Sequence, residues 1–145
     1  MYKALRVGGK LITIFAPIWS AFNGHHLPRI TDKSSKTYNH DNSPIPPWGH
    51  LIMASPQMFK YLSGHVDKET AAKMVYYIYQ SPFINRLFFE DYKQYFEKSD
   101  FEIERLEAAF PVKIKPDMQS TLDKIFSHNK QFANRGILFI ARRSH

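Results

Sequence analysis

Two short runs of almost uninterrupted apolar residues lie near the two ends of the chain. Residues 11–16 are closed by Pro17, and residues 136–141 are closed by a pair of arginines. Near-continuous apolarity over so short a run is typical of a strand covered on both faces, as in parallel sheets. A third stretch, residues 101–104, alternates between apolar and acidic positions. The pattern therefore predicts two inner strands and one half-exposed strand that lies at an edge.

Helical periodicity appears in three places between these strands. Asp67 is a suitable N-cap for the first helix, which Ser81-Pro82 ends. Two further helices are predicted around residues 90–98 and 117–127. One face of the first helix carries apolar residues at the i, i+3, i+4, i+7, i+8 spacing: Ala71, Met74, Val75, Ile78 and Tyr79.

The part of the chain between the first strand and the first helix shows neither pattern. Residues 20–47 are rich in Asn, Gly, Ser, Asp and Pro, which favours turns and loops. We assign residues 20–66 as a long loop and insertion within one domain, residues 1–145. A long segment of this kind inside a compact domain is usually functional or mobile. Strands and helices together predict an α/β layered fold.

Composition narrows the class of protein. The chain has 145 residues, of which 43% are hydrophobic and 15% aromatic, so it can bury the core of a single domain. It contains no cysteine, which excludes disulfides, thiolate metal sites and a thiol nucleophile. The apolar run at 11–17 is too short to span a membrane, and no small-residue cleavage pattern follows it. We therefore expect a cytoplasmic protein.

The net charge of +7 invites a nucleic-acid interpretation, but the distribution of the charge disfavours it. Basic residues are spread along the chain, and no block of them stands out beyond Arg142-Arg143. A diffuse excess is typical of a solvated surface. Nucleic acid and membrane are therefore not the expected partners.

The predicted elements, taken in order, resemble a known family. Residues 5–11, LRVGGKL, look like the L-x-P-G-G-x-L turn that leads into the fifth strand of class I S-adenosylmethionine-dependent methyltransferases. Residues 90–103 are similar to that family's last crossover helix, polar turn and sixth strand. Residues 136–141 resemble its seventh strand, which inserts antiparallel between the fifth and the sixth. The resemblance covers essentially the whole chain, but only the carboxy-terminal half of the family's fold.

The resemblance implies a partial Rossmann-like methyltransferase sheet, with family strands 5, 6 and 7 in the order 5-7-6 and a helical insertion. Val7 stands where the family usually has proline, a change that a turn tolerates. The family's glycine-rich turn after the first strand, and the acidic residue that ends the second, are absent. S-adenosylmethionine is therefore implied for the complete enzyme but is not expected to bind this chain alone. Expected partners are the missing amino-terminal half or a second copy, joined through the exposed strand edge.

The predicted site follows the first strand, because ligands of doubly wound sheets bind beyond the carboxyl ends of the parallel strands. His25 and His26 lie there, and an imidazole can act as general base or bind the methyl acceptor. The alternative is a solvated or hydrogen-bonded turn without catalytic duty. Aromatic and polar neighbours could line an acceptor pocket or simply close the core beneath the loop: Trp19, Asn23, Trp48 and His50.

Arg86 lies in the connection between two helices, where it could bind a carboxylate or phosphate of the acceptor. A surface salt bridge is the alternative. The histidines show no recognised metal-ligand spacing, so no metal site is expected.

Two hypotheses for function follow. The first is the carboxy-terminal portion of a methyltransferase that acts on a nucleophilic oxygen, nitrogen or carbon of a small molecule and is inactive alone. The second is a small basic module that binds RNA or a protein partner through Arg142-Arg143 and the aromatic helix with Tyr76, Tyr77 and Tyr79.

Overall fold

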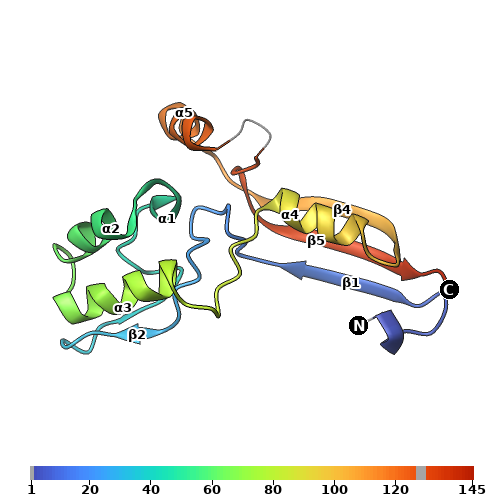
Figure 1. The fold of residues 1–145 in the computed structure, drawn as a ribbon, viewed down its shortest axis with the longest axis horizontal. Helices are drawn as coiled ribbons and strands as arrows, with labels where there is room; N and C mark the ends of the chain where they lie inside the picture. The colour runs from blue at the N-terminus through green and yellow to red at the C-terminus, as the bar shows by residue number, and fades with distance from the viewer. Residues whose placement is uncertain (1, 127–129) are drawn as a thin grey trace.

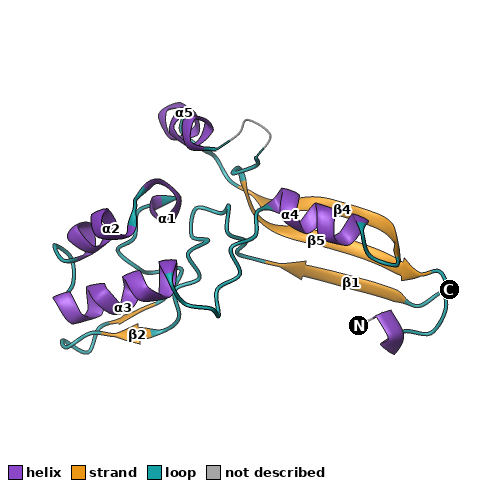
Figure 2. Ribbon diagram, viewed as in Figure 1, coloured by secondary structure: helices purple, strands orange, loops and turns teal. Residues whose placement is uncertain are grey.

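The computed structural model describes residues 2–126 and 130–145. It is a mixed α/β fold with five helices, a three-stranded sheet and a small hairpin (Figure 1). The helices α1, α2 and α3 gather beyond the carboxyl end of β1, whereas the three-stranded sheet forms the other end of the molecule (Figure 2). The elements in chain order are η1 (Tyr2–Ala4), β1 (Lys10–Phe15), β2 (Ile30–Thr31), β3 (Thr37–Tyr38), α1 (Gly49–Ile52), α2 (Ser55–Leu62), α3 (Lys68–Tyr79), α4 (Phe89–Glu97), β4 (Phe101–Pro111), α5 (Pro116–Ile125) and β5 (Asn134–Arg143).

The main sheet has the strand order β1-β5-β4, and β5 is antiparallel to both neighbours. The β1 register runs from Lys10 opposite Arg142 to Phe15 opposite Ile137. A bulge in β4 between Ile103 and Arg105 interrupts the pairing with β5. The prediction of a central carboxy-terminal strand antiparallel to both outer strands is confirmed. Among the described residues no two strands pair in parallel, so the sheet on its own is not a Rossmann sheet.

The prediction that residues 11–16 form an inner strand covered on both faces is wrong. β1 is an edge strand, and its residues alternate between exposed and half-buried. Ile12 and Ile14 keep 66% and 55% of their surface exposed, on the face opposite Leu11 and Phe15. Only that second face packs on the core, with Ile18 and the other buried residues of the cluster. An apolar run thus indicates apolar faces, but whether each face is covered depends on what packs there.

Helix α4 covers the inner face of the sheet (Figure 1). The Phe96 ring stacks on Phe139 of β5 with 3.9 Å between ring centroids, and Tyr92 meets Phe15 edge to face at 5.2 Å. The Asp91 carboxylate accepts a hydrogen bond from the Phe88 amide at 2.9 Å, which fixes the start of the helix. The helix predicted at 90–98 therefore forms, but it begins and ends one residue earlier, at Phe89 and Glu97.

The helix predicted after Asp67 also forms. The Asp67 carboxylate accepts from the Thr70 amide at 3.1 Å, and α3 runs to Tyr79 before Ser81 and Pro82. Its buried residues include Ala71, Met74, Val75 and Ile78, as the spacing predicts.

The segment assigned as a loop and insertion, residues 20–66, is more ordered than predicted. It contains the β2-β3 hairpin and the helices α1 and α2. Asp32 accepts from the backbone amides of Ser34 and Lys36 and so closes the hairpin turn. In α2, Gln57 Oε1 accepts from the Ala54 amide at 2.8 Å. β2, β3 and α1 have only two or four residues, too few to show a clear period. α2 was missed although its eight residues span two turns.

Helix α5 packs beside α1, with Leu122 fully buried. The predicted range was 117–127; α5 ends at Ile125, and Ser127 lies outside the described residues. No helix within the described residues has the length and apolarity needed to cross a bilayer.

Candidate functional site

The segment that follows β1 is a compact turn, residues 16–27, with its backbone held at several points. The Ile18 amide donates to the Arg135 carbonyl at 2.9 Å, which ties the turn to the start of β5. Gly24 donates to the Ala21 carbonyl at 3.0 Å. A Cβ at Gly24 would lie 2.3 Å from the Ile18 oxygen and 2.4 Å from the Trp19 oxygen. Only glycine permits this close approach, so it positions the histidines that follow.

His25 is buried and both of its ring nitrogens are engaged. Its Nδ1 accepts from the Leu27 amide at 3.2 Å, so the proton lies on Nε2, which is 3.3 Å from Ser43 Oγ. Burial and, to a smaller extent, the neighbouring histidines, His50 first, together lower the pKa of His25 to about 3. His25 is therefore neutral at physiological pH and acts as a hydrogen-bonded core residue.

His50 lies beside it although it is distant in sequence. The His25 and His50 ring centroids are 5.7 Å apart. His50 Nε2 donates to the Trp19 carbonyl at 2.8 Å, and its Nδ1 is buried without a partner among the described residues. Burial lowers the pKa of His50 to about 4, against the opposing effect of the bond to Trp19. An imidazole with one free, buried acceptor nitrogen is poised to take a hydrogen bond from a ligand.

His26 differs from His25 because it is partly exposed and because one of its ring nitrogens has no hydrogen-bond partner among the described residues. Its backbone is left-handed (φ 47°), and the described residues offer its Nε2 no partner. Burial and the charge of His40 lower the pKa of His26. The His40 Nε2 atom lies 3.2 Å from Oδ2 of Asp41. The structure thus gathers four histidines, which the sequence spacing did not indicate. The described residues hold no group of three or more His, Cys, Asp or Glu side chains fit to bind a metal ion.

Both tryptophans lie in the core of this region. Trp19 meets His50 edge to face at 4.7 Å, and Trp48 Nε1 donates to the Ser20 carbonyl at 3.1 Å. Both are almost fully buried, so they wall the site from within and also close the core beneath the turn.

The Arg86 side chain is hydrogen-bonded to backbone carbonyl groups. Its guanidinium donates to the Ile78 carbonyl at 2.9 and 3.2 Å and to the Ser81 carbonyl at 3.2 Å, at the end of α3. Its Cζ also lies 5.6 Å from the Trp19 ring centroid. The structure therefore places Arg86 as a cap for the last turn of α3 and a support for Trp19.

The turn is distinguished by buried polar atoms without partners. Among the described residues, seven buried side-chain atoms lack a hydrogen bond, and all but Glu90 Oε2 belong to the turn or to elements that touch it. Each such atom costs about 1–3 kcal/mol unless water or a ligand satisfies it. The start of β5, which carries Asn134 and Arg135, touches the turn through the Ile18 amide and the Phe22 ring. Its members are Ser20 Oγ, Asn23 Oδ1, His26 Nε2, His50 Nδ1, Asn134 Oδ1 and Arg135 Nε.

Asp41 joins two of these residues. Its Oδ1 accepts from Asn23 Nδ2 at 2.9 Å and from Arg135 at 3.3 Å. Sequence reasoning proposed Asn23 but missed Ser20, Asp41 and Arg135. A signal was available for Arg135: if residues 136–141 pair antiparallel with residues 11–16, the residues just before 136 must lie beside those just after 16.

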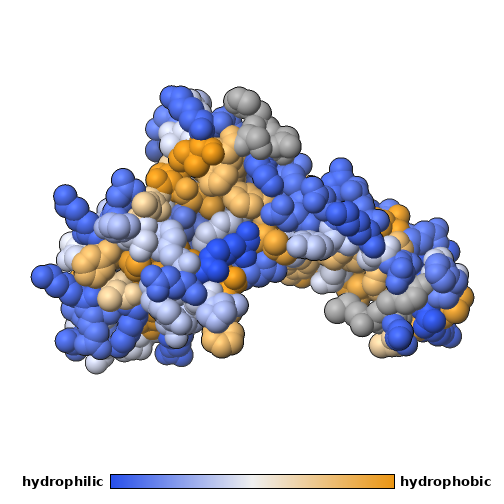
Figure 3. Space-filling view, in the orientation of Figure 1, coloured by the Kyte–Doolittle hydropathy of each residue, from blue (hydrophilic) through white to orange (hydrophobic). Residues whose placement is uncertain are grey.

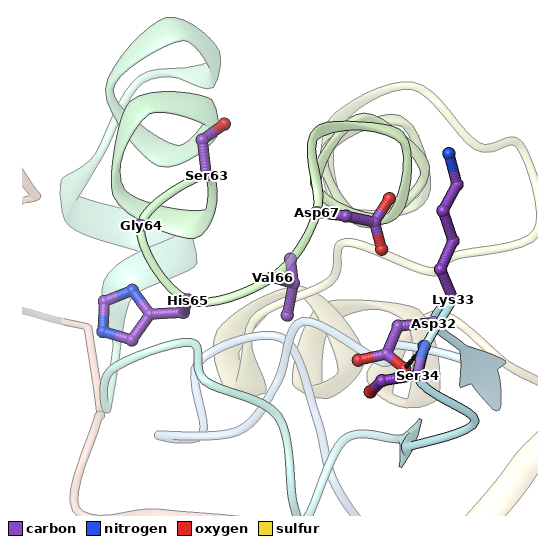
Figure 4. Close-up of a pocket in the computed structure, with 8 residues that line it drawn as sticks. All are labelled: Asp32, Lys33, Ser34, Ser63, Gly64, His65, Val66 and Asp67. Atoms are coloured by element: carbon purple, nitrogen blue, oxygen red, sulfur yellow. Dashed lines mark hydrogen bonds between the residues drawn. The ribbon is translucent and has the colours of Figure 1, made fainter.

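A separate hollow of about 360 Å³ lies between the hairpin turn and the start of α3 (Figure 4). Its polar groups already have partners. Asp32 accepts from Ser34, Lys36 and Tyr38, and Asp67 caps α3 through Thr70. It contains none of the residues predicted for the site, and its saturated carboxylates contrast with the unpartnered atoms of the turn.

The basic carboxy-terminal residues are also engaged. The Arg142 guanidinium donates to Glu104 at 2.9 Å through Nε, and Arg143 donates to the Leu5 carbonyl. On the aromatic helix, Tyr79 donates to the Met53 carbonyl at 2.7 Å, and Tyr76 is the exposed member. These contacts give Arg142, Arg143 and Tyr79 structural roles.

Comparisons with protein-family models, curated proteins and solved structures found no match to this chain.

Proposed function

We propose that this chain is the acceptor-side, carboxy-terminal portion of an S-adenosylmethionine-dependent methyltransferase with a small-molecule acceptor. The observation that carries the proposal is the group of buried, unpartnered polar atoms at the carboxyl end of β1. In doubly wound sheets this end of the strands faces the ligand crevice. Donors and acceptors held there without partners suit a polar ligand better than they suit a core.

The sheet supports the proposal in two ways. A reversed strand lies between two strands of the same direction, in the order that the resemblance implies. The other support is the bare face of the sheet, where Ile12 and Ile14 lie opposite Ile140 and Leu138. Sheets of doubly wound proteins carry helices on both faces. Further strands on the β1 edge, with helices on this face, would bury these side chains.

Among the described residues, no glycine-rich turn directly follows a strand, which is the feature that would cradle S-adenosylmethionine. The adjacent glycines, Gly8 and Gly9, form the turn at the amino end of β1, at the opposite end of the strand from the histidines. A Cβ at Gly9 would meet the Arg6 carbonyl at 2.8 Å, so this glycine serves the turn itself. The cofactor site in this proposal belongs to the other half of the fold.

The residues at the turn have distinct roles in this proposal. His26 is the general base, because its Nε2 has no partner in the described structure and its lowered pKa keeps it neutral near pH 7. His25 holds the turn through Leu27 and Ser43 and is a positioning residue. Asn23 and His50 offer hydrogen-bonding atoms to the acceptor. Trp19 supports His50 from the core.

Calorimetric titration of the isolated chain with S-adenosylmethionine is expected to show no binding in the micromolar range. The physical reason is that close backbone contact with the cofactor needs a glycine-rich turn directly after a strand, and no such turn occurs among the described residues. A dissociation constant near 1 μM, about −8 kcal/mol, would contradict this assignment.

Supplying a cofactor-binding half, fused or in trans, is expected to yield methyl transfer that depends on His26. His26→Ala should lower kcat by roughly a hundredfold or more, the usual contribution of a general base. Production of S-adenosylhomocysteine across a panel of small hydroxyl, amine and carbon acceptors measures the rate. His65→Ala is the matched control, because His65 is exposed and lies outside the turn. Full activity of His26→Ala with a native circular dichroism spectrum would remove the base assignment, and a raised KM alone would indicate acceptor binding.

A further inference from the structure

An apolar groove runs between α1 and α5 and is lined in part by Trp48. It encloses about 540 Å³, within the range of small-molecule sites. Trp48, Ile52, Met53 and Met118 supply its apolar lining. Figure 3 shows hydrophobic surface at the base of α5, on the side of α1. None of the buried histidines lines the groove, so it is distinct from the site at the turn.

The walls of the groove are fixed by the fold. The Trp48 backbone amide donates to the Phe22 carbonyl at 2.9 Å, and its indole donates to Ser20. Fully buried Leu122 holds α5 against the cluster that contains Trp48. A groove between elements anchored in this way is largely pre-formed, which lowers the entropic cost of binding.

The charges at the rim have one predominant sign. Lys113 and Lys115 line the groove, and neither has an ion pair with any described residue. Asp117 is the only acidic residue of the lining. The adjoining hollow shares Ile52, Met53 and Tyr61 with the groove and adds another cation, Lys60. An apolar lining with unpaired cations at its rim is complementary to an apolar anion.

We propose that this groove binds a small aromatic anion, with a planar ring system against Trp48 and Met118 and a carboxylate beside Lys113 and Lys115. The ring system fits the apolar lining, since aromatic and thioether groups contact aromatic rings favourably. The carboxylate forms charge-assisted hydrogen bonds with the ammonium groups of the two exposed lysines. Its oxygen atoms that are not bonded to lysine stay in contact with water. This proposal does not rest on methyl transfer.

The test is titration of the full chain with 2-naphthoate, compared with the neutral 2-naphthalenemethanol. We expect saturable binding of one naphthoate per chain, at least tenfold tighter than the neutral alcohol. The double variant Lys113→Gln, Lys115→Gln should weaken naphthoate about tenfold and change the alcohol less than twofold. Both lysines are exposed, so the variant is expected to fold. Lys124→Gln is the control: Lys124 lies in α5, whose start borders the groove, but does not line the groove, so this variant should bind as the unmodified chain does.

The location is read from the indole N–H resonances. Naphthoate should shift the Trp48 resonance more than that of Trp19, which lies away from the groove. Equal binding of the alcohol, an equal loss in Lys124→Gln, or a larger shift at Trp19 would overturn the proposal. Laurate binding tenfold tighter than naphthoate would assign the groove to alkyl-chain acids and overturn the aromatic preference. Absence of saturable naphthoate binding would overturn it entirely.

Discussion

Phe139→Ala is expected to lower the free energy of unfolding by about 3–5 kcal/mol, the range measured for aromatic residues removed from well-packed cores. Phe139 lies on the central strand and is 1% exposed. Its ring stacks on Phe96 of α4 and meets Phe101 of β4 edge to face. Removing the ring therefore opens a cavity between the helix and the sheet. Urea unfolding followed by circular dichroism measures the loss.

Ile12→Ala is the matched control for this prediction. Ile12 lies on the neighbouring strand β1, directly before Thr13, and Thr13 is paired with Phe139. Because Ile12 is largely exposed, its truncation should cost below about 1 kcal/mol. Equal losses in the two variants would show that the bare face of the sheet is buried in solution, by a second copy or by a partner. Sedimentation at several protein concentrations separates these two cases.

Acidification from pH 7.5 to 5 is expected to destabilise the fold by about 4 kcal/mol, through His25 and His50. Burial lowers the pKa of His25 from 6.5 to about 3 and that of His50 from 6.5 to about 4. Below pH 6.5 the unfolded chain takes up protons that the folded chain refuses, so the free energy of unfolding falls as pH falls. Each histidine contributes about 1.4 kcal/mol per pH unit between pH 6.5 and 5, so the two together contribute about 4 kcal/mol. Toward pH 7.5 the unfolded histidines also become neutral and the dependence fades.

Two substitutions remove the titrating groups while keeping a hydrogen bond. His25→Asn places an amide oxygen where Nδ1 accepts from Leu27, and His50→Gln places an amide N–H where Nε2 donates to Trp19. The double variant should lose most of the slope of stability against pH between 6.5 and 5. His65→Gln, an exposed histidine, should keep it. An unchanged slope in the double variant would mean that other groups control acid unfolding.

The sequence predicted the helices α3, α4 and α5 and the strand β5 because their patterns are local. It predicted only the first four residues of β4, which continues to Pro111. The N-cap Asp67 and the apolar spacing that follows it define α3 within a dozen residues, and tertiary contacts only fill in its buried face. The strand 136–141 was likewise expected at the centre, and it pairs on both sides. The short hairpin and α1 escaped prediction, since two or four residues cannot establish a period.

For the candidate site, the sequence supplied the residue types and the strand that precedes them, but not their environments. His25 and His26 are chemically identical neighbours, and nothing in the sequence separates a histidine with both nitrogens bonded from one with a free nitrogen. That difference arises from Leu27, Ser43 and the left-handed backbone at His26. His50 enters the site through contacts across 25 or more residues, with His25 and with the Trp19 carbonyl.

The solvent exposure of the strand residues is the clearest property that the tertiary structure, and not the sequence pattern, determined. The residues of β1 and β5 are comparably apolar, so the sequence by itself determines that both form strands. How far each residue is buried depends on its neighbours: β5 has a strand on each side, whereas β1 has one, and α4 covers a single face. On the other face Ile12 and Ile14 of β1 are exposed, and Leu138 and Ile140 of β5 are half-buried. Burial is a property of what surrounds a residue, and hydrophobic periodicity records only the preference of the side chain.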